Sequence, residues 1–138
     1  MMKISNLVVC FMLMVFMHIV DDFYLQGILA KLKQKKFWQE NAPAEMYRHD
    51  YIIALAAHAF SWCMCIHIPM FVFWYFTGGF SLLAFVINFV VQATIHAVID
   101  NLKANKLKIN LIKDQLLHLL QISVTLFLYS FVRYKIIG

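Results

Sequence analysis

The chain contains four apolar segments of membrane length, and these restrict its fold more than any other feature. They run over about Ile4–Val20, Tyr51–Phe76, Phe80–Ile99 and Leu116–Val132. As a helix, even the shortest would extend about 25 Å, close to the hydrocarbon thickness of a bilayer. None alternates polar and apolar residues as a membrane β-strand would. The sequence therefore predicts an all-α polytopic membrane protein with four transmembrane helices in an antiparallel bundle.

Composition agrees with this class of protein. Of all residues, 63% are apolar and 14% are charged, and the mean hydropathy is +0.74, values that do not describe a soluble domain. No repeat, linker or low-complexity segment divides the sequence, so residues 1–138 are predicted to form one domain. The first apolar segment resembles a signal peptide, but no small-x-small cleavage site follows it. We expect it to be the first helix of the mature protein.

Basic residues gather in two of the predicted loops. They are Lys31, Lys33, Lys35, Lys36 and Arg48 in the first loop, and Lys103, Lys106, Lys108 and Lys113 in the third. The positive-inside rule predicts a multi-pass inner-membrane protein with both loops in the cytoplasm. With a net charge of +5, these loops are expected to contact anionic lipid headgroups. Nucleic-acid binding is not expected, because aromatic residues do not interleave with the basic ones. The sequence leaves open whether the protein forms a homo-oligomer or binds a protein partner.

Two asparagines indicate helix starts. Asn41, ahead of Pro43, predicts the cap and first turn of the second helix. Asn110 predicts the cap of the fourth helix, which places Asp114 in the first turns, where the helix dipole favours a carboxylate. Pro69 lies inside the second apolar segment and is expected to kink that helix.

Three histidine–aspartate pairs with i,i+4 spacing lie at the ends of three apolar segments. They are His18/Asp22, His96/Asp100 and Asp114/His118, and His58 adds a further imidazole near the start of the second segment. Each ionisable residue at membrane depth costs roughly 2.5 kcal/mol or more on insertion scales. In the predicted topology all seven residues meet at one depth, near the cytoplasmic face.

Helical spacing extends these residues into polar stripes, because residues four or seven apart share a face. The stripes are Asn88, Gln92, His96, Asp100 and Lys103; Asp114, His118, Gln121 and Thr125; His58, Ser61 and Cys65; and His18, Asp22 and, somewhat off the stripe, Gln26. These faces are predicted to line a polar interior, with the apolar faces toward lipid.

One chemistry that accounts for this cluster is metal binding. Three carboxylates with only Lys103 as a nearby fixed cation would repel one another, and one or two divalent cations would offset them. Imidazole and carboxylate ligands suit zinc, and also manganese or ferrous iron. The predicted ligands are His18, Asp22, His58, His96, Asp100, Asp114 and His118, enough for a binuclear site.

Such a site would activate a water for hydrolysis. The candidate catalytic carboxylates are Asp22, Asp100 and Asp114, and Gln26, Lys103 and Gln115 are candidates for supporting or substrate contacts. Asp21, at i+3 from His18, competes with Asp22 as the partner of His18, and helical phase favours Asp22. An enzyme is therefore one hypothesis for this chain.

Two alternatives keep the same residues without a metal. Three Asp/His ion pairs can form an ion or proton pathway, which the polar stripes toward Asn88 and Thr125 favour. The same groups can instead be the structural polar core of a membrane protein that interacts with a host or regulatory partner.

Other side chains have simpler interpretations. Cys10, Cys63 and Cys65 lie in apolar segments and are expected to act as small hydrophobic residues. His67 is expected to be an interfacial residue, on the face of its helix opposite His58. The expected interface anchors and packing residues are Trp38, Trp62 and Trp74.

The ordered motifs also resemble those of a known family. They are His18-Ile-Val-Asp21-Asp22-Phe23-Tyr24-Leu25-Gln26, then His58, then His96-Ala-Val-Ile-Asp100-Asn-Leu-Lys103, then Asp114-Gln115-Leu-Leu-His118. This pattern resembles an uncharacterised family of small four-helix membrane proteins from bacteria and their phages. It is also similar to bacterial proteins described as membrane-bound metal-dependent hydrolases. The resemblance implies a metal site and hydrolysis, and it names no substrate.

Overall fold

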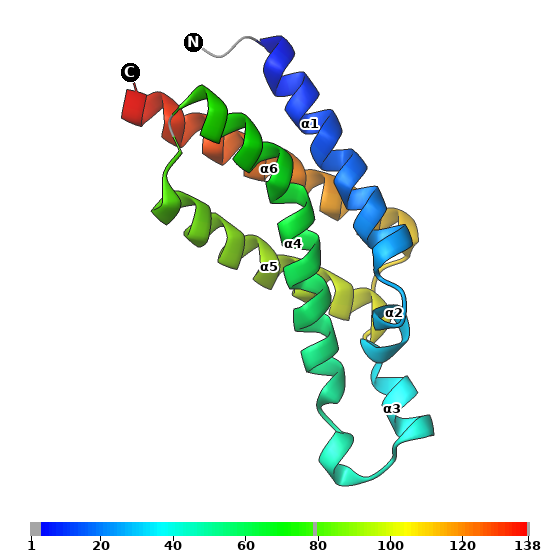
Figure 1. Cartoon of the computed structure of the whole chain (residues 1–138). Coiled ribbons are helices and arrows are strands. Elements are labelled where there is room, and N and C mark those ends of the chain that lie inside the picture. Colours follow the sequence, from blue (N-terminus) through cyan, green and yellow to red (C-terminus); the bar gives the residue numbers. More distant parts are fainter. Residues whose placement is uncertain (1–3, 79, 138) are drawn as a thin grey trace.

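The computed structural model describes residues 4–78 and 80–137, and helices dominate these ranges (Figure 1). The helices are α1 (Ile4–Ile19), the π-helix η1 (Val20–Leu25), α2 (Leu29–Leu32), α3 (Lys35–Asn41), the 3-10 helix η2 (Glu45–Tyr47), α4 (Asp50–Thr77), α5 (Leu82–Ala104) and α6 (Leu111–Ile137). No strand occurs in the described ranges. The prediction of an all-α protein is therefore confirmed.

Four of the helical stretches are long and apolar enough to cross a membrane. They are Ile4–Leu25, Glu45–Thr77, Leu82–Ala104 and Leu111–Val132. Each contains most of a predicted segment. Large apolar side chains stand exposed along all four, among them Phe16, Ile53, Val90 and Leu120. An exposed apolar surface of this extent is typical of a protein that faces lipid.

The four long helices pack around one another (Figure 1). α4 contacts α1 on one side and α5 on the other, and α6 contacts both α5 and α1. The short α2 and α3 lie in the connection between the first and second spans, and both contact α4. This arrangement encloses a common interior, which is apolar over one part of its length and polar over another.

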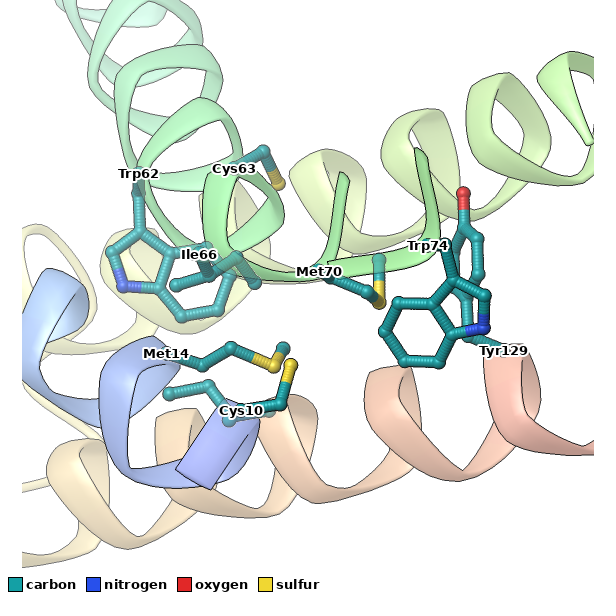
Figure 2. Packing of buried hydrophobic residues seen from close by; sticks show 9 residues of the cluster. Cys10, Met14, Trp62, Cys63, Ile66, Met70, Trp74 and Tyr129 are labelled. Atoms are coloured by element: carbon teal, nitrogen blue, oxygen red, sulfur yellow. The ribbon is translucent and has the colours of Figure 1, made fainter. Parts of the chain in front are cut away.

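The apolar part of the interior is built around α4. Its buried residues are Cys10 and Met14 of α1, Trp62, Cys63, Ile66, Met70 and Trp74 of α4, and Ile122 and Tyr129 of α6. Figure 2 shows Trp62 and Ile66 of α4 next to Met14 and Cys10 of α1, with Tyr129 beside Trp74 farther along the bundle. Cys10, Cys63 and Cys65 are free and buried. Cys10 and Cys63 act as small apolar residues in this core, as the sequence predicts.

His67 lies in the protein interior, so the expectation of an interfacial residue is wrong. Its side chain is only 1% exposed. The ring packs against Phe85, Phe89 and Tyr129, and Nδ1 lies 2.8 Å from the carbonyl oxygen of Cys63. An i−4 carbonyl satisfies one ring nitrogen within the helix itself, so an imidazole can be buried among aromatic rings without reaching the headgroups.

The two predicted helix starts have different outcomes. Asn110 does cap α6, since its side-chain oxygen accepts a hydrogen bond from the backbone N–H of Lys113 at 3.0 Å. Asn41 instead ends α3, where its amide donates to the carbonyl of Phe37, and α4 begins only at Asp50. Proline is common both just after the end of a helix and in its first turn. Pro43 alone therefore did not show whether Asn41 begins a helix or ends one. Pro69 lies inside α4, and the kink expected there stays a prediction.

Candidate metal centre

The polar part of the interior brings together all seven residues predicted as metal ligands. His18 and Asp22 come from the end of the first span, His58 from the first half of α4, His96 and Asp100 from the end of α5, and Asp114 and His118 from the start of α6. All are buried except Asp22, of whose side chain 7% is exposed. The four long helical stretches therefore contribute polar side chains to one region of the interior, next to the connections that contain the basic residues.

Six of the seven residues form three groups that could each hold a cation. The groups are Asp22/His58/His96, His96/Asp100/His118 and Asp22/Asp114/His118, and in each group one possible ligand atom per residue lies within 4.8 Å of the others. Every pair of groups shares one residue, which is Asp22, His96 or His118. Because the groups share ligands, they form one continuous centre.

Several contacts in this centre match the spacing of ligands around one ion. His58 Nε2 lies 3.4 Å from Asp22 Oδ1 in the first group, and His118 Nε2 lies 3.6 Å from Asp100 Oδ1 in the second. His118 Nε2 lies 3.5 Å from Asp114 Oδ1. Ligands at about 2.0–2.1 Å from a tetrahedral zinc ion are about 3.3 Å from one another. These atoms thus lie at coordination spacing without any rearrangement.

Some polar atoms of the centre lack hydrogen-bond partners among the described residues. They include Asp22 Oδ1, Asp114 Oδ1 and His118 Nε2. A buried polar atom left without a partner costs about 1–3 kcal/mol. Asp22 Oδ1 lies beside His58 Nε2, and Asp114 Oδ1 lies beside His118 Nε2. A cation near either pair would bind a carboxylate oxygen and an imidazole nitrogen, so the donor types fit a divalent metal.

The centre also contains more carboxylate groups than lysine ammonium groups. Its buried carboxylates are those of Asp21, Asp22, Asp100 and Asp114. Lys33 Nζ donates to Asp100 Oδ2 at 2.5 Å, and Lys103 Nζ donates to Asp114 Oδ2 at 2.6 Å. With neutral imidazoles, four carboxylates and two ammonium groups leave two negative charges. One divalent cation would balance them.

The expectation that Lys103 is the only fixed cation near the carboxylates is wrong, because Lys33 also contacts Asp100. The connection after η1 folds back against the end of α5, because Asn105 bridges the two segments. Its side-chain amide donates to the carbonyl of Lys33 at 3.0 Å, and its side-chain oxygen accepts the backbone N–H of Lys35 at 2.6 Å. Helical spacing gave no signal for Lys33, because the helix is interrupted at Gly27, whose φ is +48°, before α2 begins at Leu29.

The π-helix η1 gives the two adjacent acids different positions. Its wider turn is closed by the i,i+5 hydrogen bond from the N–H of Gln26 to the carbonyl of Asp21. Asp22 belongs to two of the cation groups and Asp21 belongs to none. Asp21 instead accepts the hydroxyl of Ser61 at 2.5 Å and lies 3.4 Å from His58 Nδ1. A carboxylate at the second nitrogen of a ligand imidazole orients that imidazole.

His18 lies outside the three cation groups. Its Nδ1 accepts a hydrogen bond from Trp62 Nε1 at 2.8 Å, and its Nε2 lies 3.0 Å from Gln115 Oε1. The predicted pairing with Asp22 is close, at 3.7 Å. The amide of Gln115 donates in turn to Asp22 and Asp114, at 3.2 Å each. His18 thereby connects α1 to the carboxylates through Gln115.

Trp62 is the main residue of the centre that sequence reasoning missed. Its ring stacks on His96, with centroids 4.1 Å apart and planes at 17°, while its N–H binds His18. The spacing of four residues from His58 was a signal for this position, but the apolar character of tryptophan favoured a packing or interface role.

A buried polar row continues from the centre toward the other end of the bundle. His118 Nδ1 lies 3.3 Å from Gln121 Oε1, and the Gln121 amide donates to Gln92 Oε1 at 3.0 Å. Gln92 donates in turn to Asn88 at 3.4 Å. Thr125 is also fully buried. The predicted polar stripes of α5 and α6 therefore face each other inside the protein.

A cavity of about 360 Å³ adjoins the centre on the side of the basic connections. Asp100 lines it together with Gln26, Lys33, Gln34 and Lys103. Small side chains of Ala30 and Ala104 and the side chain of Leu107 complete the lining. Asp100 belongs both to the cavity wall and to a cation group, so the cavity lies next to the candidate metal centre.

No protein-family model, no curated protein and no solved structure matches this chain.

Proposed function

We propose that this protein is a multi-pass membrane protein that binds divalent cations in the His/Asp centre and uses them for hydrolysis. The observation that carries the proposal is the set of three interlocking groups, whose possible ligand atoms lie within 4.8 Å of one another. The four carboxylates outnumber the two ammonium groups, and with neutral imidazoles this leaves two negative charges that one divalent cation would balance.

The donor set favours a catalytic site over a purely structural one. Imidazole and carboxylate suit zinc first, with manganese and ferrous iron as alternatives. No cysteine belongs to the three groups found among the described residues. Each group offers three protein ligands, and catalytic zinc sites combine three protein ligands with a bound water. A bound cation would supply an activated water at neutral pH.

Side chains of the protein would then accept the proton that the water releases. Asp22, Asp100 and Asp114 supply carboxylate oxygens within the centre, and a carboxylate that does not bind the ion can accept a proton from a nearby water. Lys103 is hydrogen-bonded to Asp114 and Lys33 to Asp100. These ammonium groups hold the carboxylates in place and balance part of their charge.

In the membrane, we propose four antiparallel spans with both basic connections in the cytoplasm, in contact with anionic headgroups. The centre would then lie near the cytoplasmic surface of a bacterial inner membrane. The resemblance of the motifs to the family of small bacterial and phage membrane proteins agrees with this proposal and stays a prediction.

Elemental mass spectrometry on detergent-purified protein tests the metal assignment. We expect about one or two transition-metal ions per chain, and near-complete loss in the His96→Ala/Asp100→Ala variant. The matched control is His67→Ala, which removes another fully buried imidazole outside the centre and should keep the metal. Wild-type protein without stoichiometric metal, both as purified without chelator and after reloading, would overturn the proposal.

The polar row beyond the centre favours one other function, an ion or proton pathway. In that case proton flux into liposomes should fall strongly in Gln92→Leu or Gln121→Leu, because these two amides are hydrogen-bonded to each other inside the row. Serine at the exposed position 123 provides the control variant Ser123→Leu. Wild-type flux no greater than that of empty liposomes would exclude the pathway.

A further inference from the structure

The cavity beside the metal centre has the chemistry of an anion-binding pocket. Its lining includes two ammonium groups, from Lys33 and Lys103. The side-chain amides of Gln26 and Gln34 also line it, but they already donate to the carbonyls of Asp22 and Ala30, so the lysines are the main donors for a ligand. Asp100 is the acidic residue of the lining, and Lys33 already neutralises it at 2.5 Å. The walls therefore offer hydrogen-bond donors and positive charge to a ligand.

Both lysines retain donors for a ligand. An ammonium group has three N–H donors, and the hydrogen bonds between described residues use one from each lysine, to Asp100 and to Asp114. Lys33 is buried, with 8% of the residue exposed. Burying a charged lysine is unfavourable unless its donors are satisfied. An anion in the cavity would satisfy donors of both ammonium groups.

The volume of the cavity and the residue at its edge indicate what kind of ligand it can bind. A volume of about 360 Å³ is at the small end of ligand pockets and suits a compact polar group. Leu107 lines the cavity, yet 83% of it is exposed. Its backbone is left-handed, with φ at +51°, which is uncommon and unfavourable for a bulky residue. This conformation places an apolar side chain beside a polar pocket.

We propose that this cavity binds the phosphate group of a phosphate ester, presented to the adjoining metal centre for hydrolysis. The inference rests on the proposed function, because it names the substrate class of the same site. In the reaction, the oxygen of a water forms a bond to phosphorus while the ester P–O bond breaks. The departing alcohol takes one proton from that water, and inorganic or substituted phosphate leaves with the other.

Two sources of phosphate ester fit this chemistry, a phospholipid headgroup and a soluble phosphate compound. Leu107 at the rim favours the lipid, because an apolar residue beside a phosphate site can contact the first part of an acyl chain. Calorimetric titration of the purified protein in alkyl-maltoside micelles, which contain no phosphate ester, distinguishes the sources. The probes are inorganic phosphate and short-chain phosphatidate, each added to zinc-loaded and to chelator-treated protein.

We expect zinc-loaded protein to bind both probes, and phosphatidate at least about tenfold more tightly than inorganic phosphate if lipid is the source. Equal affinities would assign the pocket to soluble phosphate esters. Lys33→Gln and Lys103→Gln should each weaken binding about tenfold or more. Lys106→Gln is the matched control, because Lys106 is exposed and does not line the cavity.

A steric variant tests the pocket without changing charge. Ala30→Leu adds volume to the cavity wall and should reduce the affinity for both probes at least tenfold, while the bound zinc stays at the wild-type level. Ala57→Leu makes the same substitution at an exposed helix position outside the cavity and should bind as the wild type does.

Metal content, measured on the same samples, separates this inference from the proposed function. Protein that carries stoichiometric zinc but binds neither probe overturns the phosphate pocket and leaves the metal centre intact. If the protein cannot retain zinc but still binds phosphate through both lysines, the pocket is supported and the metal function is overturned. Lysine variants that bind both probes with wild-type affinity would overturn the pocket as well.

Discussion

Trp62 and His96 form a parallel stack, with ring centroids 4.1 Å apart, while the indole N–H of Trp62 donates to His18 at 2.8 Å. One buried side chain of α4 therefore contacts imidazoles of both α1 and α5. The stack restricts the orientation of His96, which belongs to two cation groups. The hydrogen bond requires Nδ1 of His18 to be an acceptor, and this leaves Nε2 to donate to Gln115.

Trp62→Phe tests whether this contact supports metal binding. The phenyl ring can keep the stack on His96 but cannot donate to His18. Loss of a supporting hydrogen bond typically lowers metal affinity about 10–100-fold, so we expect a shift of this size in a competition titration with a fluorescent zinc chelator. The matched control is Trp74→Phe, because Trp74 is also buried but its Nε1 has no hydrogen-bond partner among the described residues. Equal affinities for the two variants would contradict a role for the Trp62 N–H.

The adjacent acids Asp21 and Asp22 should respond differently to neutralisation. Asp22→Asn removes a ligand shared by two cation groups and should lower the number of bound ions per chain. Asp21→Asn keeps all members of those groups and weakens the carboxylate contacts with His58 and Ser61. The ion count should therefore persist, with affinity reduced about 10–100-fold. Elemental analysis and chelator competition measure the two quantities. An unchanged ion count in Asp22→Asn, together with a loss in Asp21→Asn, would reverse the assignment.

The buried ion pair of Lys33 and Asp100 should contribute strongly to the stability of metal-free protein. Lys33→Met leaves the Asp100 carboxylate buried beside the other acids, and breaking a buried pair from one side costs about 3–5 kcal/mol. Unfolding of chelator-treated protein in mixed detergent micelles measures this cost. The exposed pair of Lys36 and Glu40 is the control, for which Lys36→Met should change the unfolding free energy by about 0–1 kcal/mol.

A double variant checks the physical reason for that effect. Asp100→Asn removes the charge that Lys33→Met leaves unpaired, so Lys33→Met/Asp100→Asn should be more stable than Lys33→Met alone. A double variant as unstable as the sum of both single variants would show that the ion pair has no coupling energy.

Removal of bound metal should lower the thermal stability of the whole protein. Ligands from all four spans meet in the centre, so a cation that binds only the folded state stabilises it by mass action. We expect chelator treatment to lower the melting temperature and zinc to restore it, as followed by circular dichroism in detergent. In His96→Ala/Asp100→Ala the melting temperature should be independent of chelator. A chelator effect of the same size in this variant would place the bound metal elsewhere.

Helical spacing, together with the position of the pairs at the ends of the apolar segments, was sufficient to predict most of the polar centre. The pairs His96/Asp100 and Asp114/His118, and the isolated His58, lie on regular helices, where residues four apart share a face. The ends of the apolar segments then determine the depth at which they meet. For the same reason the polar row through Gln92 and Gln121 was predicted from periodicity and is buried in the structure.

The features that spacing did not predict depend on irregular backbone or on contacts between distant segments. Asp21 and Asp22 acquire separate roles through a π-helix, which leaves no clear pattern in a single sequence. Lys33 reaches Asp100 because the connection after the first span folds against α5, an arrangement fixed by Asn105. The two ring nitrogens of His18 are occupied by Trp62 and Gln115, and neither partner could be identified from the local sequence of α1.

The π-helical turn at Val20–Leu25 also determines how the first span is rotated about its own axis. This turn contains one residue more than an α-helical turn would require between the same points. A deletion of Phe23, whose side chain is exposed, would return the segment to regular α-helix. Residues before the turn would then rotate by about 100° relative to Gln26 and Lys33. Such a deletion would direct Met14 and Cys10 away from α4. The rotation of the first helix and the geometry of the polar centre therefore depend on the one additional residue in this turn.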